Sequence, residues 1–135
     1  MDLLAATPTS KAKFKFIDPA TGNPACTDKG AEMFVSVFGG HTREFQAATI
    51  EKHRRTIAIF EKHNLKDGDK ITEEVKAEMA VSDVQMRCDI TAAILVQIDG
   101  KECKAKKTFY ANDAFDPWIV DIAKFADNKA NFTTA

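Results

Sequence analysis

The stretch from Thr72 to Ile98 constrains this fold most, because its pattern fits one long helix with two apolar sides. At about 100° per residue, two sets of apolar residues fall on opposite lines of such a helix. The first line holds Ala77, Val81, Val84, Cys88, Thr91, Leu95 and Ile98, and the second holds Met79, Met86, Ile90 and Ala93. A helix with two apolar sides needs two partners. Either the rest of the same chain covers both sides, or a second copy covers one of them.

The composition predicts one folded domain with no bias toward nucleic acid or membranes. The chain has 135 residues, a length at which a single hydrophobic core suffices without disulfide bonds. Its 19 basic and 20 acidic residues give a net charge of -1, which offers no overall attraction for nucleic acid or an acidic membrane. No basic leader and no apolar run of membrane-spanning length is present. We therefore expect a soluble protein.

Shorter patterns before the central stretch predict a small β element. Lysine and phenylalanine alternate between Lys11 and Ile17, as expected of a half-buried edge strand. The residues from Ala31 to Phe38 are apolar on both faces except at Ser36, which predicts an inner strand. Between them, the segment from Asp18 to Pro24 is rich in proline, glycine and asparagine and predicts a change of chain direction.

A second helical pattern precedes the central stretch. The segment from His41 to His63 predicts a surface helix with one buried arc. That arc holds Phe45, Thr49, Ile50, His53, Thr56, Ile57 and Phe60. Thr72, followed by two glutamates, predicts the capped start of the central helix.

The last third of the chain predicts a turn and one more helix. Asp99 and Gly100 indicate a tight turn, after which the lysine-rich segment from Lys101 to Tyr110 predicts at most a short edge strand. Asp116 followed by Pro117 predicts a capped helix start. The apolar face of that helix holds Trp118, Ile119, Ile122, Phe125 and Ala126.

No residue pattern predicts catalysis or a metal site. His53 has two readings. In the first it is a metal ligand or general base, and in the second it is a core or interface histidine. The lack of a histidine or carboxylate four residues away on the same face favours the second reading. The Asp67 to Asp69 segment begins like a calcium loop, but Lys70 and Ile71 occupy positions that need oxygen ligands. The three cysteines have no ligand spacing, so reduced thiols are expected.

Four segments, read together, carry a family resemblance. They are Phe14–Pro24 (FKFIDPATGNP), Val35–Phe45 (VSVFGGHTREF), Ile98–Lys101 (IDGK), and Asp116–Ile122 (DPWIVDI) running into Asp127–Phe132 (DNKANF). In this order, and spanning nearly the whole chain, they resemble the tail assembly chaperones of long-tailed bacteriophages.

This resemblance implies a non-catalytic protein without cofactor or metal. It would associate with itself, coat the tape measure protein and help bring tail tube subunits to it, in the cytoplasm of the infected bacterium. Neither nucleic acid nor a membrane would be a partner. The alternative is a virion structural protein, such as a tail tube, head–tail connector or capsid-decorating subunit. A small enzyme built on His53 is a third hypothesis.

The expected fold is α+β and mostly helical, with a small N-terminal β element, two long helices and a C-terminal helix. Residues 1–12 are expected to form a flexible arm, residues 13–130 a single globular domain, and residues 131–135 a frayed end. Five apolar residues are the candidates for partner binding, each with an ordinary core position as the alternative. They are Phe34, Phe38, Met79, Met86 and Trp118.

Overall fold

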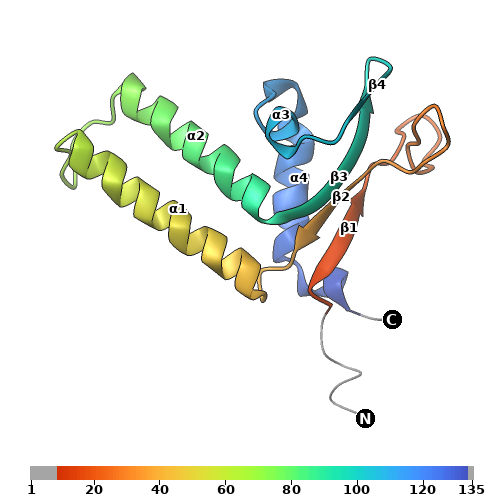
Figure 1. Cartoon of the computed structure of the whole chain (residues 1–135), viewed down its shortest axis with the longest axis horizontal. Helices are drawn as coiled ribbons and strands as arrows, with labels where there is room; N and C mark the ends of the chain where they lie inside the picture. Colours follow the sequence, from red (N-terminus) through yellow and green to blue (C-terminus); the bar gives the residue numbers. More distant parts are fainter. Residues whose placement is uncertain (1–8, 134–135) are drawn as a thin grey trace, which may run out of the picture.

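The computed structural model describes residues 9–133 and confirms an α+β fold: an antiparallel sheet, helices packed on it, and a projecting helical hairpin (Figure 1). The strands are β1 (Lys11–Lys15), β2 (Phe34–Phe38), β3 (Thr91–Ile98) and β4 (Lys101–Cys103). The helices are α1 (Arg43–Lys62), α2 (Glu73–Asp89), α3 (Lys106–Tyr110) and α4 (Asp116–Asp127), with 3₁₀ turns η1 (Asp113–Phe115) and η2 (Lys129–Phe132).

The sheet has the order β1-β2-β3-β4, and every pair is antiparallel. In the register, Phe14 lies opposite Val35 and Val35 opposite Ile94, so these three side chains share one face. The alternation predicted for the first strand is therefore confirmed, and β2 is an inner strand as predicted. Lys13 lies opposite Ser36 on the other face, which leaves the lysines of β1 exposed.

The hydrophobic core lies between one face of the sheet and α4, which runs behind the sheet in Figure 1. Ile119, Ile122 and Ala126 of α4 are buried, as the sequence pattern predicted. Phe109 of α3 and Phe132 of η2 close the two ends of this layer. The core members are Phe16, Val35, Val37, Ile94, Val96, Phe109, Tyr110, Ile119, Ile122, Ala126 and Phe132.

The single long helix predicted from Thr72 to Ile98 is wrong. Helix α2 ends at Asp89, and residues 91–98 form β3, an inner strand of the sheet. Half of the residues in this strand are β-branched, which suits a pleated surface, and Ile94 and Val96 alternate into the core. Pairing with β2 satisfies the backbone of this segment, so the tertiary environment overrides its helical spacing.

Helices α1 and α2 form an antiparallel hairpin that projects from the sheet (Figure 1). Each helix begins as expected, because the hydroxyls of Thr42 and Thr72 accept hydrogen bonds from the amides of Phe45 and Val75. At the tip, Glu78 contacts Lys62 Nζ and His63 Nε2. The hydrogen bond from Lys62, with help from His63, lowers the pKa of the Glu78 carboxyl and raises that of Lys62.

The buried arc predicted for the first helix is wrong for most of its members, although Phe45 packs against the core. Helix α1 contacts α2 through Arg55, which donates to Ser82 Oγ and O at 2.9 and 3.1 Å, while Ala48 is its only buried residue. Ile50 and His53, placed on the predicted arc, are exposed. His53 is therefore not a core histidine in this chain.

The ends of the described region differ from the sequence-based expectation. Residues 1–8 of the predicted arm lie outside the described residues, but Lys11 and Ala12 belong to β1. The backbone amide and hydroxyl of Thr9 both donate to the carbonyl of Phe132, whose ring is fully buried. The segment from 131 to 132 is thus part of the core rather than a frayed end, and residues 134–135 are not described.

Two boundaries near the C-terminus also change. The lysine-rich segment from 101 to 110 contains the predicted short edge strand, β4, and then the helix α3. Asp116 does not cap α4 with its side chain, because η1 runs directly into the helix from an Asn112 cap. Pro117 does lie in the first turn, where its missing N–H costs nothing.

Candidate protein-binding groove

Large apolar side chains are exposed at three places on the described part of the chain. Val81 on α2 and Val120 on α4 flank a groove, while Ile50 and Ile57 lie on α1. Ile17 and Trp118 lie beside a second hollow. Exposed apolar residues that cluster in this way are typical of binding surfaces.

The groove lies between α2 on one side and the segment from α3 to α4 on the other, and it encloses about 570 Å³. Val81 is 66% exposed and Val120 is 51% exposed, although each lines a concave surface. Val84 and Ile119 continue the apolar lining toward the core. The complete lining is Ala80, Val81, Asp83, Val84, Gln85, Arg87, Lys107, Tyr110, Ala111, Asp113, Asp116, Ile119 and Val120.

Charged residues border this apolar floor. Asp83 forms an ion pair with Lys52 of α1 at 2.6 Å, so its charge is already compensated. Asp113 and Asp116 have no ion pair with any residue in the range 9–133. Arg87 and Lys107 also line the groove, so its margin carries charges of both signs. An apolar strip with such a margin suits an amphipathic helix that has charged residues beside its apolar face.

The inner end of the groove is held by a buried hydrogen-bond chain. The hydroxyls of Tyr110 and Thr91 lie 2.7 Å apart, and Thr91 Oγ1 also donates to the carbonyl of Arg87 at 2.8 Å. Burial raises the pKa of Tyr110 to about 12, and the hydrogen bond between Tyr110 and Thr91 opposes this only in part. The phenol therefore stays neutral and ties α3 to the junction between α2 and β3.

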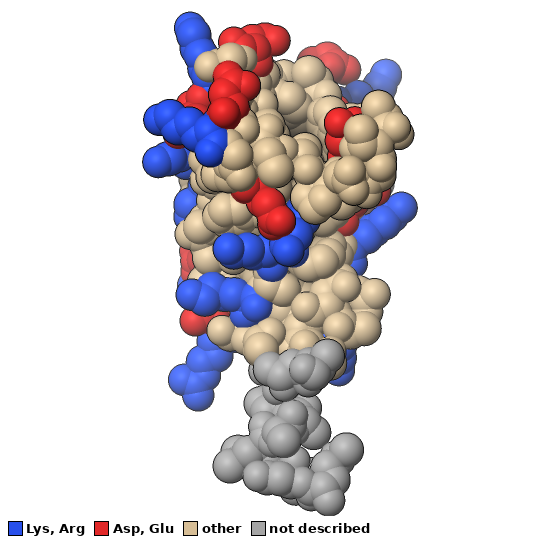
Figure 2. Space-filling model, turned by 90° about the vertical axis from the view of Figure 1, so that its right-hand side faces the viewer, with Lys and Arg blue, Asp and Glu red and all other residues tan. Residues whose placement is uncertain are grey.

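The second hollow is an aromatic pocket of about 320 Å³ between the loop after β1 and the start of α4. Trp118 is 44% exposed at this pocket and contacts the rings of Phe16 and Phe115. Figure 2 faces this side of the molecule and shows a hollow in the upper half that is surrounded mainly by uncharged residues. The pocket is large enough for one or two apolar side chains of a partner.

The five residues predicted for partner binding do not form one site. Phe34 and Phe38 share the sheet face that carries the lysines, and Lys13 Nζ lies 4.4 Å from the centroid of the Phe34 ring. Met79 and Met86 are half-buried on α2, and Trp118 lies at the aromatic pocket.

The sequence patterns did not single out Val81 and Val120 as binding residues. Val81 was placed on an apolar stripe of the long helix, and Val120 lies outside the apolar face of α4. A signal for Val120 exists in the sequence, because an apolar residue on the polar side of an amphipathic helix indicates exposure.

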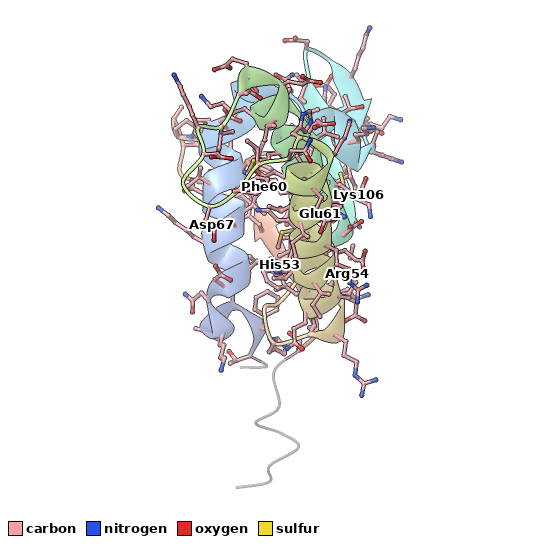
Figure 3. All side chains as sticks on the ribbon, turned by 90° about the vertical axis from the view of Figure 1, so that its left-hand side faces the viewer. His53, Arg54, Phe60, Glu61, Asp67 and Lys106 are labelled. Carbon is pink, nitrogen blue, oxygen red and sulfur yellow. The ribbon has the colours of Figure 1, made fainter. Side chains whose placement is uncertain are left out.

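The residue types that could hold a metal ion are dispersed over residues 9–133. No cluster of three or more histidine, cysteine or acidic side chains there is placed to hold a metal ion. His53 lies on the side of α1 nearest α4 in the view of Figure 3, with Phe60, whereas Arg54 points the other way. The three cysteines are free thiols, and burial raises the pKa of Cys88.

Within residues 9–133, no helix combines the length and apolar content that a bilayer crossing needs.

Comparison with models of protein families, with curated proteins and with solved structures finds no match to this chain.

Proposed function

We propose that this chain is a non-catalytic tail assembly chaperone of a long-tailed bacteriophage, which associates with itself and binds the tape measure protein while the tail is built. The family resemblance of the sequence motivates the identity of the client. The observation that carries the binding role is the groove between α2 and α4, where Val81 and Val120 remain 66% and 51% exposed. The protein acts in the cytoplasm of the infected cell, without cofactor, nucleic acid or membrane.

The groove supports a helical client for a physical reason. Its α2 side, from Ala80 to Arg87, covers seven residue steps or about 10.5 Å, which is close to two turns of a bound helix. A client helix would place apolar residues at spacings of three, four and seven against Val81 and Val120. Long tape measure segments with such stripes would otherwise aggregate, and covering them keeps them soluble.

Co-expression with the tape measure protein of the same phage tests this proposal. The wild-type chain is expected to keep that client soluble and to co-purify with it. A Val81→Glu, Val120→Glu variant should stay folded by circular dichroism, because both positions are exposed, but should lose the complex. Ile50→Glu is the matched control, since Ile50 is equally exposed and lies away from the groove.

Two outcomes would overturn the chaperone role. One is a client that stays insoluble and forms no complex with the wild-type chain. The other is the presence of this chain at a fixed copy number in purified virions, measured by mass spectrometry. That second result would instead indicate a structural subunit of the tail or head, which the lysine-bearing edge strand β1 also suits.

A further inference from the structure

Strand β1 forms the longer open edge of the sheet, since β4 at the opposite edge has only three residues. Just after β1, the amide of Phe16 donates to the carbonyl of Met33 at 3.3 Å. Backbone groups alternate in direction along an antiparallel strand, so those of Lys13 and Lys15 point away from β2. Within residues 9–133, these outward groups have no hydrogen bond. The edge therefore offers two amides and two carbonyls to a further strand.

The sheet face that carries these lysines, which we call the lysine face, is basic along β1. Lys11 and Lys13 form no ion pair within residues 9–133. Lys15 contacts Glu32 at 3.3 Å, with 51% and 48% of the two side chains exposed. Such an exposed pair contributes little stability, so it can open, and one carboxylate leaves the three lysines with a net positive charge.

The basic surface continues past Lys11 into a shallow hollow of about 730 Å³ beside Phe38. The charged residues of its lining are Lys11, Lys104, Lys106, Lys107 and Asp89. Asp89 accepts a hydrogen bond from Gln85 Nε2 at 2.8 Å. Since the lysines outnumber this carboxylate, an acidic segment along β1 meets positive charge at this end as well.

The opposite face of β1 is apolar and incompletely covered. Phe14 is half-buried, although Val35 beside it on β2 is completely buried. The ring of Phe14 packs edge-on against Phe125 of α4 at a centroid distance of 5.6 Å, and Phe125 is half-buried as well. Asp121, four residues before Phe125, lies on the same flank of α4. This face therefore suits apolar partner residues and disfavours acidic ones.

We infer that β1 accepts an extended segment of a partner protein as a fifth strand of the sheet, and that acidic and apolar residues alternate along that segment. Directly opposite residues of an antiparallel pair share a face. Partner residues opposite Lys13 and Lys15 thus lie on the lysine face and are acidic, and the residue between them lies over Phe14 and is apolar. Main-chain hydrogen bonds to the edge supply affinity, and the alternating side chains supply specificity.

The lysines also exclude a second copy of this chain as the added strand. Pairing of two β1 edges would bring lysines of one copy opposite lysines of the other, and like charges directly opposite destabilise a strand pair. The edge is separate from the groove, because no residue of β1 lines that groove. An acidic strand at β1 is therefore a second interaction, which does not depend on the proposed function.

A synthetic peptide of alternating glutamate and valine, EVEVEVE, tests this contact by calorimetric titration of the whole chain. The matched control is the same peptide with N-methylated glutamates, which keeps every charge and removes the amides that would face the edge. The peptide KVKVKVK keeps the alternation and reverses the charge. Only EVEVEVE should bind. Equal binding of the N-methylated peptide, or no binding of EVEVEVE at millimolar concentration, overturns the added strand.

Amide hydrogen exchange, measured by NMR, locates the contact without any variant. In the free chain, the amides of Lys13 and Lys15 should exchange rapidly, while those of Ala12 and Phe14 are protected by their bonds to β2. With about 90% of the chain bound to EVEVEVE, exchange at Lys13 and Lys15 should slow about tenfold, because only the free chain exchanges. Binding that leaves these two amides unprotected contradicts strand addition.

Charge reversal at the edge tests the acidic part of the pattern. Lys13→Glu should bind EVEVEVE about tenfold more weakly, since an attractive cross-strand pair becomes a repulsive one. The same variant should gain binding of KVKVKVK, which also shows that it is folded. Lys101→Glu, on the opposite edge strand β4, is the matched control and should bind EVEVEVE as wild type does. Unchanged binding by Lys13→Glu would remove the acidic partner.

A single-stranded nucleic acid is the competing occupant of the lysine face. Oligothymidylate should not displace EVEVEVE from the chain. Displacement of the peptide by oligothymidylate would assign the lysine face to nucleic acid and overturn the proposal.

The groove variant separates this contact from the chaperone role. Val81→Glu, Val120→Glu should bind EVEVEVE as wild type does, and Lys13→Glu should keep the complex with the tape measure protein. A chain that binds the peptide but not the tape measure protein loses the chaperone role alone. A chain that binds the tape measure protein but not the peptide loses the added strand alone.

Discussion

The sheet with α4 and the α1–α2 hairpin are stabilised in different ways. All eleven members of the main core come from the sheet, α3, α4 and their flanking turns, and none comes from α1 or α2. In the hairpin, the buried residues are Ala48, Val75 and Ser82. The hairpin therefore depends on polar contacts such as the one between Arg55 and Ser82, and on half-buried side chains.

This difference indicates that the sheet with α4 forms a rigid body and that the α1–α2 hairpin opens more easily. A region with few buried apolar contacts opens locally at a lower free energy than a well-packed core does. Surfaces that bind and release partners belong on such a region, or at its border with a rigid body. The groove with Val81 and Val120 has this position, because one wall is hairpin and the other is α4.

The largest effect expected from this comparison is on global stability. Ile122→Ala removes a side chain that is 2% exposed and should lower the free energy of unfolding by about 2–5 kcal/mol, since a cavity remains in the core. Ile50→Ala, the same change on α1 at 52% exposure, should stay within about 0.5 kcal/mol. Urea denaturation at low protein concentration measures both. Equal losses would contradict the division into core and hairpin.

The next effect concerns Tyr110, at the junction of the two regions. Its pKa is about 12 in the folded chain against 10.0 for the free side chain. The folded state keeps its proton where the unfolded state loses it, so this stabilisation is complete below pH 10 and is lost as the pH rises toward 12. The loss amounts to about 3 kcal/mol.

The chain has one tyrosine, so its ultraviolet absorbance titrates this phenol alone. Tyr110→Phe is the control, and it should remove this part of the alkaline loss of stability. A phenol that ionises near pH 10 in the folded chain would show that the junction is open to water.

The smallest effect is local to the hairpin. Arg55→Lys cannot make both hydrogen bonds to Ser82 and should cost about 1 kcal/mol of local stability, since one neutral or charged bond is worth about that much. Hydrogen exchange of α1 amides should then rise about fivefold while exchange in the sheet stays unchanged. Arg54→Lys is the control, because Arg54 contacts only the exposed Glu51. Faster exchange throughout the sheet would mean that hairpin and body open as one unit.

Local sequence signals predicted where elements begin and which fold class they build. Thr42 and Thr72 start helices because their hydroxyls accept amide hydrogen bonds within one turn, a contact that needs no tertiary partner. The alternation from Lys11 to Lys15 set the faces of β1 for the same reason, since successive side chains of a strand point to opposite sides. The α4 face of Ile119 and Ile122 likewise follows from helical spacing alone.

The binding surfaces were predictable only in part. Trp118 was selected from the sequence and lies at the aromatic pocket, whereas the groove valines were not selected. Exposure depends on which neighbours an apolar residue finds after folding. On α1, whose main described neighbour is α2, the arc with Ile50 and Ile57 stayed outside. Spacing predicted the arc itself but did not show which side of α1 another element would cover.

The sequence by itself determined the helix caps, the alternation of β1 and the amphipathic face of α4, because each depends on residues within a few positions of one another. Only the tertiary structure decided that α2 ends at Asp89 and that residues 91–98 become an inner strand. No glycine or proline marks that boundary, and the apolar residues there fit a helix as well as a strand. Hydrogen bonds to β2, more than fifty residues earlier in the chain, make the strand the more stable choice.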